Sequence, residues 1–367
     1  MANIRDGNDR QWHDGTRVPV WRCPLWVPTK PNGAKRLLHL ASFAASSTPV
    51  ALAQARWRPN LVFTVEPTLF SAPVALLTAK LSGAKSWLHI QDLEVDAAFD
   101  MGLLPKGYLK HVALWLEHAL LSRFDRITTI SERMLARVEE KNYPPEKLSL
   151  FPNWADINTI HPLPDKASPF RLELDIKEDQ TVALYAGNLG EKQGLELLAD
   201  AARMLKDRRD IVFVIAGAGS ARERLKDQTS DLPNVRWLPL QPLERLNDLL
   251  SLADIHLLPQ RADAADLVMP SKLTGMLASG RPVVATVTPE TQVGRIVETC
   301  GILAAPGDTT ALTEAIAALA ADTVKRRRLG NAARAYAERN LDRDAIMNRF
   351  SETAMTLCHL PAEKETA

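Results

Sequence analysis

The second half of the chain alternates short, almost wholly apolar runs with longer helical patterns. Helical patterns at 194–205 and 242–253 lie between such runs. Apolar runs of this kind are typical of strands in a parallel sheet that helices cover on both faces. The pattern therefore predicts an α/β fold with strands over the following runs: TVALYAG (181–187), IVFVIAG (211–217), VRWLPL (235–240), DIHLLP (254–259) and RPVVAT (281–286).

The first half repeats this alternation. We expect strands at 61–66, 86–91 and 126–131 and a helix over 108–124. The turn-rich stretch 151–169 contains four prolines and is the natural linker between the two halves. A length of 367 residues also suggests two domains.

Glycine and polar residues follow three of the expected strands in the second half. NLGEKQG follows the first of these strands, and QRADAADLVMPSK leads from the fourth into a helical pattern. Ligands of open parallel sheets bind beyond the carboxyl ends of the strands, where backbone N–H groups, lysines and helix starts suit phosphate. The sequence predicts a diphosphate site made of Gly187, Asn188, Gly190, Lys192, Gly217, Gly219, Ser271 and Lys272.

Each feature of this site also has a purely structural explanation. The glycines suit tight turns between strand and helix, and MPSK suits a helix start with Pro270 in its first turn and one exposed lysine. No GxGxxG or Walker pattern is present, so the motifs indicate neither a dehydrogenase nor an NTPase. The convergence of several features on one sheet edge is what favours the phosphate site.

The first quarter of the chain is basic. Residues 1–88 hold 11 Lys or Arg against 4 Asp or Glu, a net of +7 in a chain whose total is +1. This bias suits anionic lipid, nucleic acid or phosphorylated substrates, and it also suits a solvated face. We expect peripheral membrane contact through the apolar stretch 37–55, with an amphipathic core helix as the alternative. The flanking basic residues are Lys30, Lys35, Arg36, Arg56 and Arg58.

Cysteine use and the opening residues indicate the cytoplasm. Cys23, Cys300 and Cys358 are odd in number and in no metal-ligand spacing, which is typical of reduced thiols. The opening residues, MANIRDGNDRQWHDG, are polar and unlike a secretory signal peptide, and no apolar run reaches the roughly 20 residues that span a bilayer.

Three segments together resemble a known family. SLFPNWADI, ALYAGNLGEKQGLELL and LADIHLLPQRADAADLVMPSKLTGMLASGRPVVAT are similar to retaining GT-B glycosyltransferases of the family 4 type, especially bacterial exopolysaccharide enzymes such as colanic-acid fucosyltransferases. The resemblance implies two Rossmann-like domains with parallel sheets that face each other across a cleft. The expected domains are an acceptor-side domain over 1–157, a nucleotide-sugar domain over 158–340, and a returning helix with a tail over 341–367.

The resemblance also implies a reaction. A sugar, with GDP-fucose as the expected donor, would pass with retention of configuration to a polyprenyl-diphosphate-linked oligosaccharide, without a metal ion or other cofactor and without nucleic acid. Lys192, Lys272 and the helix start near Pro270 would stabilise the leaving diphosphate. The alternatives are a sugar-nucleotide epimerase of the same architecture and a non-catalytic remnant that binds a nucleotide or a partner.

Matching the donor-side motifs residue by residue shows departures. The family's phosphate-gripping arginine corresponds to Asn188 and is absent, and its lysine corresponds to Lys192, offset by one unless Gln193 fills its place. The family also has two glutamates eight residues apart. The second corresponds to Gly275 in this sequence, and the first corresponds to a position near Asp266 or Leu267. Leu240, the last residue of the third run, completes the expected donor side.

The acceptor side is expected in the first half. LHIQDLEVDAAFD (88–100) places His89, Asp92 and Glu94 near the cleft, with Asp92 beside the acceptor hydroxyl. The alternative is that His89 and Asp92 only fix the loop. Family members open with a strand, a glycine-rich turn and a helix, which we do not find before VPVWRCPLWVP. We therefore expect an incomplete acceptor side and a chain that is poorly stable or inactive alone.

Overall fold

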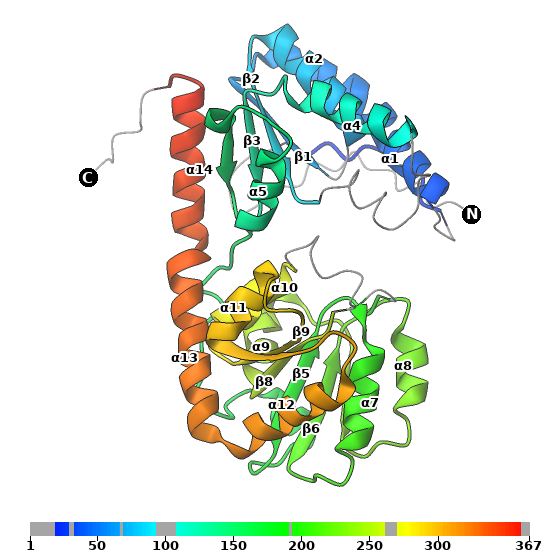
Figure 1. Ribbon diagram of the computed structural model, residues 1–367, viewed down its shortest axis with the longest axis vertical. Coiled ribbons are helices and arrows are strands. Elements are labelled where there is room, and N and C mark those ends of the chain that lie inside the picture. The colour runs from blue at the N-terminus through cyan, green and yellow to red at the C-terminus, as the bar shows by residue number, and fades with distance from the viewer. Residues whose placement is uncertain are drawn as a thin grey trace. The chain divides into compact units, whose positions relative to one another are not determined.

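The chain forms two compact units. In a computed structural model, described here for residues 19–28, 33–66, 69–92, 108–190, 193–260 and 270–360, unit 1 comprises 1–151 and 349–367 and unit 2 comprises 152–348 (Figure 1). Each unit is built around its own parallel sheet. The prediction of two Rossmann-like α/β units is therefore confirmed.

Unit 1 contains a four-stranded parallel sheet in the order β1-β2-β3-β4. Its strands are β1 (Leu61–Glu66), β2 (Lys85–Ile90), β3 (Arg126–Thr129) and β4 (Leu148–Leu150). The three strands expected in this half are confirmed. The fourth, β4, was not predicted, because three residues carry no readable alternation.

In the described ranges of unit 1, four helices connect or precede these strands. They are α1 (Gly33–Gln54), α2 (Ala72–Ser82), α4 (Tyr108–Leu121) and α5 (Glu132–Glu139). α1 packs against α2, and α2 packs against α4. Short 3₁₀ turns occur at Ala55–Trp57, Leu69–Ser71 and Pro145–Lys147. None of the helices in the described ranges is both long and apolar enough to cross a bilayer.

The last helix, α14 (Arg343–Leu357), starts in unit 2 and ends in unit 1. Its Phe350 ring lies 4.8 Å from the Trp87 ring, 5.3 Å from Phe63 and 4.9 Å from Phe151, between ring centroids. Aromatic pairs at such distances stabilise a core beyond the area that they bury. The end of the chain is thereby tied to the face of β1 and β2.

Unit 2 contains a six-stranded parallel sheet in the order β10-β9-β8-β5-β6-β7. The strands are β5 (Thr181–Ala186), β6 (Ile211–Ala216), β7 (Val235–Leu238), β8 (Ile255–Leu258), β9 (Val283–Thr286) and β10 (Gly301–Ala304). The order reverses between β5 and β8, as in doubly wound nucleotide-binding sheets. All five strands expected in this half are present, and β10 is an addition.

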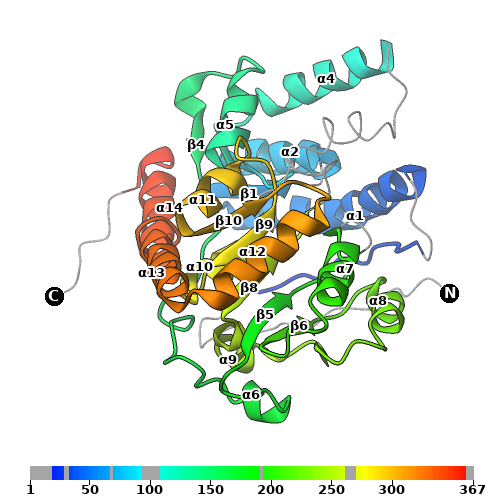
Figure 2. The same ribbon diagram turned by 60° about the horizontal axis from the view of Figure 1, so that its bottom comes forward.

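Helices cover both faces of this sheet (Figure 2). Ile211, Phe213 and Ile215 of β6 belong to one core with α7, α8 and α12, whereas Val212, Val214 and Ala216 belong to the other with α6 and α9. Because both faces are buried, every position of the strand is apolar. The helices are α6 (Phe170–Glu173), α7 (Glu196–Met204), α8 (Arg222–Gln228), α9 (Leu246–Leu252), α10 (Lys272–Ala278), α11 (Gln292–Cys300), α12 (Thr309–Ala321) and α13 (Thr323–Asn340).

The proline-rich stretch 151–169 is held against α13 by hydrogen bonds from arginine side chains, and Arg334 makes several of them. Arg334 donates hydrogen bonds to the carbonyl oxygens of Ile160 at 2.8 Å and Ile157 at 3.1 Å, and to that of Ala278 at 2.9 Å. Beside it, a Cβ on Gly330 would lie 2.3 Å from the carbonyl oxygen of Gly280. The backbone of α13 therefore approaches the turn after α10 as closely as glycine allows.

We expect Gly330→Ala to destabilise unit 2. Alanine inside a helix normally stabilises it by about 1 kcal/mol relative to glycine, but overpacking costs about 1–3 kcal/mol, and the clash here is with backbone. The measurement is the free energy of unfolding in urea. The neighbouring exposed position serves as control, because Asn331→Ala leaves stability unchanged or raises it slightly. An equally stable Gly330→Ala protein would contradict this close approach.

Candidate functional site

Two turns interlock at the carboxyl end of the unit 2 sheet. The N–H of Gly187 donates to the carbonyl of Ala216 at 3.0 Å, and that of Leu189 donates to Ala218 at 2.9 Å. A Cβ on Gly217 would lie 2.0 Å from the Gly187 carbonyl oxygen, and one on Gly219 would lie 2.3 Å from that of Leu189. Only glycine fits at these two positions, so the structure brings Gly187, Gly217 and Gly219 together at this edge, with Gly219 exposed.

Lys272 reaches this pair of turns from the first residue of α10. Its Nζ donates to Tyr185 Oη and to Gln193 Oε1, each at 3.1 Å, and lies 4.5 Å from the centroid of the Tyr185 ring. Its Cδ would be 3.5 Å from a Cβ on Gly187. The end of β5, the turn that follows and the start of α10 therefore meet around one ammonium group, although Lys272 is 87 residues from Tyr185 in the sequence.

The partners of this ammonium group are neutral. Burial lowers the pKa of Lys272 to about 8, and burial also raises the pKa of the Tyr185 phenol. In the ranges that the structure describes, no carboxylate forms an ion pair with Lys272. A cation held by neutral oxygens and an aromatic face keeps its charge available for an anionic ligand.

Tyr185 was missed by the sequence analysis. Its side chain is buried, and Oη donates to the carbonyl oxygen of Asn188 at 2.7 Å while it accepts from Lys272. Tyr185 thus joins the first turn to the lysine. The available signal was a single phenol in the strand TVALYA, where every other residue after Thr181 is aliphatic. Gln193, considered in the sequence as a substitute for the family's lysine, contacts Lys272 instead.

The other residues predicted for the donor side lie either at or near this edge or outside the described residues. Ser271 is exposed and makes no side-chain cap bond to α10, and Leu240 is 73% exposed. A Cβ on Gly190 would lie 3.2 Å from Asn188 Nδ2. Lys192 and Asp266 lie outside the described residues. Their roles stay predictions.

The position that lacks the family's second glutamate has apolar surroundings. A Cβ on Gly275 would lie 3.2 Å from Leu250 Cδ1 and 3.9 Å from Ile160 Cδ1. A side chain there would begin between two aliphatic groups, so a carboxylate would lose hydration close to its backbone. The surroundings of Gly275 match the absence of a charged residue.

On the acceptor side, His89 is buried in the aromatic cluster of unit 1. Its side chain is 2% exposed, its Nδ1 lies 3.0 Å from Thr128 Oγ1, and its ring is 5.0 Å from that of Phe151. Burial lowers its pKa to about 4, so the imidazole is neutral near pH 7. This placement favours the structural alternative for His89. Asp92 lies half-buried just beyond β2, and Glu94 lies outside the described residues.

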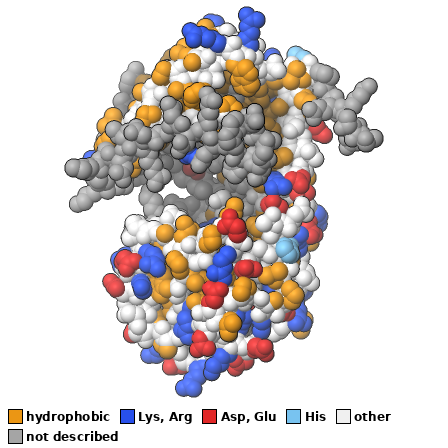
Figure 3. All heavy atoms as spheres, turned by 180° about the vertical axis from the view of Figure 1, so that it is seen from behind, with side chains coloured by type: hydrophobic (Ala, Val, Ile, Leu, Met, Phe, Trp, Pro, Cys, Tyr) orange, Lys and Arg blue, Asp and Glu red, His pale blue; other side chains and the backbone are white. Residues whose placement is uncertain are grey.

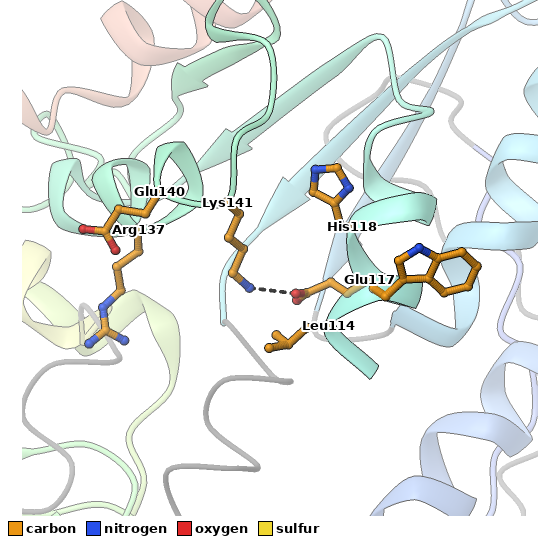
Figure 4. Close-up of a pocket in the computed structure, with 7 residues that line it drawn as sticks. Leu114, Glu117, His118, Arg137, Glu140 and Lys141 are labelled. Carbon is orange, nitrogen blue, oxygen red and sulfur yellow. Dashed lines mark hydrogen bonds and ion pairs between the residues drawn. The ribbon is translucent and has the colours of Figure 1, made fainter. Parts of the chain in front are cut away.

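A separate pocket of about 590 Å³ lies between α4 and α5 (Figure 4). Inside it, Lys141 Nζ lies 2.7 Å from Glu117 Oε2, and Glu117 is buried. These residues belong to the final turns of α4 and to the end of α5, so they lie toward the amino ends of β3 and β4. Ligands of such sheets bind at the opposite edge, and the buried carboxylate already has its counter-charge. The pocket therefore receives no functional assignment.

Metal-ligating side chains do not gather in the part of the chain that the structure describes. No group of three or more His, Cys, Asp or Glu residues is placed there to hold an ion. At the carboxyl edge of the unit 2 sheet, Lys272 supplies a positive charge beside Tyr185 and Gln193.

Two family models match the chain, one on each half. Residues 3–154 match the glycosyl transferase 4-like domain, and residues 180–322 match the glycosyl transferases group 1. The chain is 41% identical over 337 residues to the putative colanic acid biosynthesis glycosyl transferase WcaI of Escherichia coli. This match covers 90% of this chain and 82% of that protein. It is 28% identical over 221 residues to the probable glycosyltransferase WbjE of Pseudomonas aeruginosa, covering 57% and 54% of the two chains.

Solved structures show the same architecture. HepE of Anabaena in complex with UDP superposes with a TM-score of 0.68 at 19% identity, covering 88% of this chain and 84% of that chain. Sucrose-phosphate synthase of Thermosynechococcus elongatus superposes with a TM-score of 0.70 at 19% identity, covering 90% and 80%. With two Rossmann-like units, matches on both halves and a relative of 41% identity, the chain belongs to the GT-B glycosyltransferases.

Proposed function

We propose that this glycosyltransferase moves a sugar from a nucleoside-diphosphate donor to a polyprenyl-diphosphate-linked oligosaccharide, with retention, in the synthesis of a colanic-acid-like exopolysaccharide. The observation that carries the donor class is the Lys272 ammonium, which neutral groups hold beside two glycine turns at the carboxyl edge of a parallel sheet. The name of WcaI supports the pathway, and the UDP bound to HepE supports a nucleoside diphosphate. GDP-fucose is the expected donor from the family resemblance.

The reaction requires charge to be stabilised on the leaving group. As the bond to the sugar breaks, negative charge collects on the diphosphate, and a preorganised cation stabilises it without reorganisation. Lys272 supplies this cation, and Tyr185 and Gln193 hold it in place. The turns at Gly187 and Gly217 let the backbone approach the phosphates. Lys192 and Ser271 would add to the same contact, without a metal ion.

The acceptor belongs with unit 1 in this proposal. Asp92, half-buried at the carboxyl end of β2, is the residue proposed to lie beside the acceptor hydroxyl, with Glu94 close to it in the sequence. A polyprenyl carrier is embedded in a bilayer, so the enzyme would work as a peripheral protein at the cytoplasmic face of the membrane.

The function is tested by measuring release of nucleoside diphosphate from GDP-fucose, with and without a lipid-linked oligosaccharide. Release that needs the acceptor supports the transferase, and an acceptor-independent nucleotide-sugar product supports an epimerase. Nucleotide binding without turnover supports a non-catalytic protein. A parallel assay with UDP-glucose tests a donor that differs from GDP-fucose in both base and sugar. An arm with EDTA should show undiminished turnover, because the proposed charge stabilisation comes from lysine.

We expect Lys272→Ala to weaken donor binding and to slow transfer. A hydrogen bond to a charged group contributes about 1.5–3 kcal/mol, which corresponds to a loss of about ten- to hundredfold. Calorimetric titration with GDP and steady-state kinetics measure the two effects. Lys226→Ala, at an exposed position on α8, is the matched control and should behave as wild type. Wild-type affinity in a folded Lys272→Ala protein would remove the lysine from the site.

The donor kcat/KM should fall as the pH rises through about 8, where Lys272 loses its proton. Below that pH the side chain carries the positive charge that attracts diphosphate, and above it the side chain is neutral. The kcat/KM profile reports groups of the free enzyme, so it is the quantity to follow. Lys272→Arg keeps its charge at high pH and should lose this limb of the profile. An unchanged limb in that variant would assign the titration to another group.

We expect Tyr185→Phe to act through Lys272. The variant keeps the aromatic ring under the ammonium but removes the hydroxyl that accepts from Nζ and donates to Asn188. The donor KM should rise, and the alkaline limb should move to lower pH because the ammonium loses one acceptor. Tyr336→Phe on α13 is the control. An alkaline limb at the wild-type pH would show that Tyr185 only packs.

A further inference from the structure

One surface of unit 1 combines large exposed apolar side chains with basic ones. Along α2, Leu77 and Leu81 are exposed, and Lys80 lies on the same stripe. α2 packs against the turn Ala55–Trp57, where Trp57 is 77% exposed, flanked by exposed Arg56 and Arg58. These six residues are called the α2 face below.

The α2 face lies at the amino-terminal edge of the sheet. The N–H of Lys85, the first residue of β2, donates to the carbonyl of Asn60 at 2.9 Å, which brings the end of α2 beside the residues that follow Trp57. The expected donor and acceptor groups follow the carboxyl ends of strands. The α2 face is therefore separate from the catalytic residues proposed above.

Acidic side chains are few near this face. Among the residues described between 19 and 125, the acidic ones are Glu66, Asp92, Glu117 and Asp125, of which the first and third are buried and Asp92 is half-buried. Asp125, at the amino end of β3, is partly exposed and lies 3.6 Å from Lys85 Nζ, which gives it a counter-charge. Arg56, Arg58 and Lys80 make no ion pair in those same ranges. In Figure 3, the coloured side chains of unit 1 are mainly apolar and basic, whereas acidic and basic ones are mixed over unit 2.

We propose that the α2 face docks on the surface of a bilayer that contains anionic lipid. Tryptophan and leucine suit the boundary between head groups and acyl chains, and Arg and Lys place their stems along apolar surface with their charge at the phosphates. The six residues of the face include three cations and no acid, and Asp125 nearby is paired with Lys85, so the face is complementary to an anionic surface. This inference rests on the proposed lipid-linked acceptor, which would reach the enzyme in that bilayer.

The α2 face adjoins the stretch 37–55, for which membrane contact is expected. Leu37 and Leu38 at the start of that stretch are exposed, whereas the described side chains of α1 from 39 to 54 are mostly half-buried, and α1 packs against α2. Arg56 and Arg58, which flank that stretch, remain part of the proposed contact. The apolar part of the contact comes from Trp57 and α2.

The test is co-sedimentation of the full chain with vesicles of phosphatidylcholine, with and without phosphatidylglycerol, at low and high salt. The wild type should bind the anionic vesicles at low salt and leave them at high salt. The triple variant Arg56→Glu, Arg58→Glu and Lys80→Glu should bind at least about a hundredfold more weakly, because each neutralised basic residue lowers binding about fivefold. Leu77→Ser with Leu81→Ser should weaken binding to anionic vesicles with its salt dependence retained.

Matched variants on unit 2 test whether vesicle binding depends on the α2 face itself or only on the total charge and hydrophobicity of the protein. Lys166→Glu, Lys206→Glu and Lys226→Glu reverse three exposed lysines, and Leu172→Ser with Val324→Ser removes two exposed apolar side chains. Both should bind vesicles far better than the α2 face variants. Equal losses in the two sets, equal binding to neutral vesicles, or no binding by the wild type would each overturn the proposal.

Titration with GDP distinguishes a failure of this proposal from a failure of the proposed function. Variants of the α2 face should bind GDP as the wild type does, because the face is remote from Lys272 in the sequence and belongs to the other unit. Vesicle binding without acceptor-dependent turnover would leave the docking surface standing and reject the transferase. Turnover on a detergent-solubilised acceptor without vesicle binding would do the reverse.

Discussion

Burial of the unit 2 sheet on both faces is the constraint on which the rest of this unit depends. Alternate residues of β5 and β6 enter two different cores, so the strands have no place for a solvated side chain. Polar chemistry is therefore confined to the strand ends and to the loops that leave them. The glycines at 187, 217 and 219 let two of these loops interlock, and Lys272 lies against the first.

Keeping a half-buried lysine charged without a carboxylate costs free energy, and the surroundings of Lys272 reduce this cost. Burial favours the neutral amine, which is why the pKa of this side chain falls to about 8. A carboxylate partner would stabilise the ammonium but would also cancel its charge toward a ligand. The phenol of Tyr185 and the amide of Gln193 give the ammonium acceptors without cancelling it. His256 shows the other outcome, because burial lowers its pKa to about 3 and leaves it a neutral partner of Ser279.

Much of the fold could be predicted from the sequence because strands buried on both faces leave continuous apolar runs. β4 escaped prediction because it has only three residues, and β10 because a glycine opens it. The edge of the sheet where Lys272 lies was predicted from loop composition, since parallel strands bring their carboxyl ends together. Tyr185 could not be identified as its partner, because the two are 87 residues apart and a tyrosine within a strand is ordinarily core. His89 was expected at the acceptor, but it shares a face of β2 with Trp87, and that face is covered by Phe350.

In the two proposals, the units would use positive charge at different ranges. Lys272 would act at contact distance in a half-buried setting, where salt screens little, whereas the α2 face would act on a lipid surface through exposed groups that salt screens over about 10 Å. A net charge of +1 for the chain hides this division, because the basic excess lies in residues 1–88. The enzyme should therefore leave a bilayer at a lower salt concentration than the one that weakens its binding of a nucleoside diphosphate. Membrane attachment and donor binding would then be controlled separately, because their charges differ in exposure.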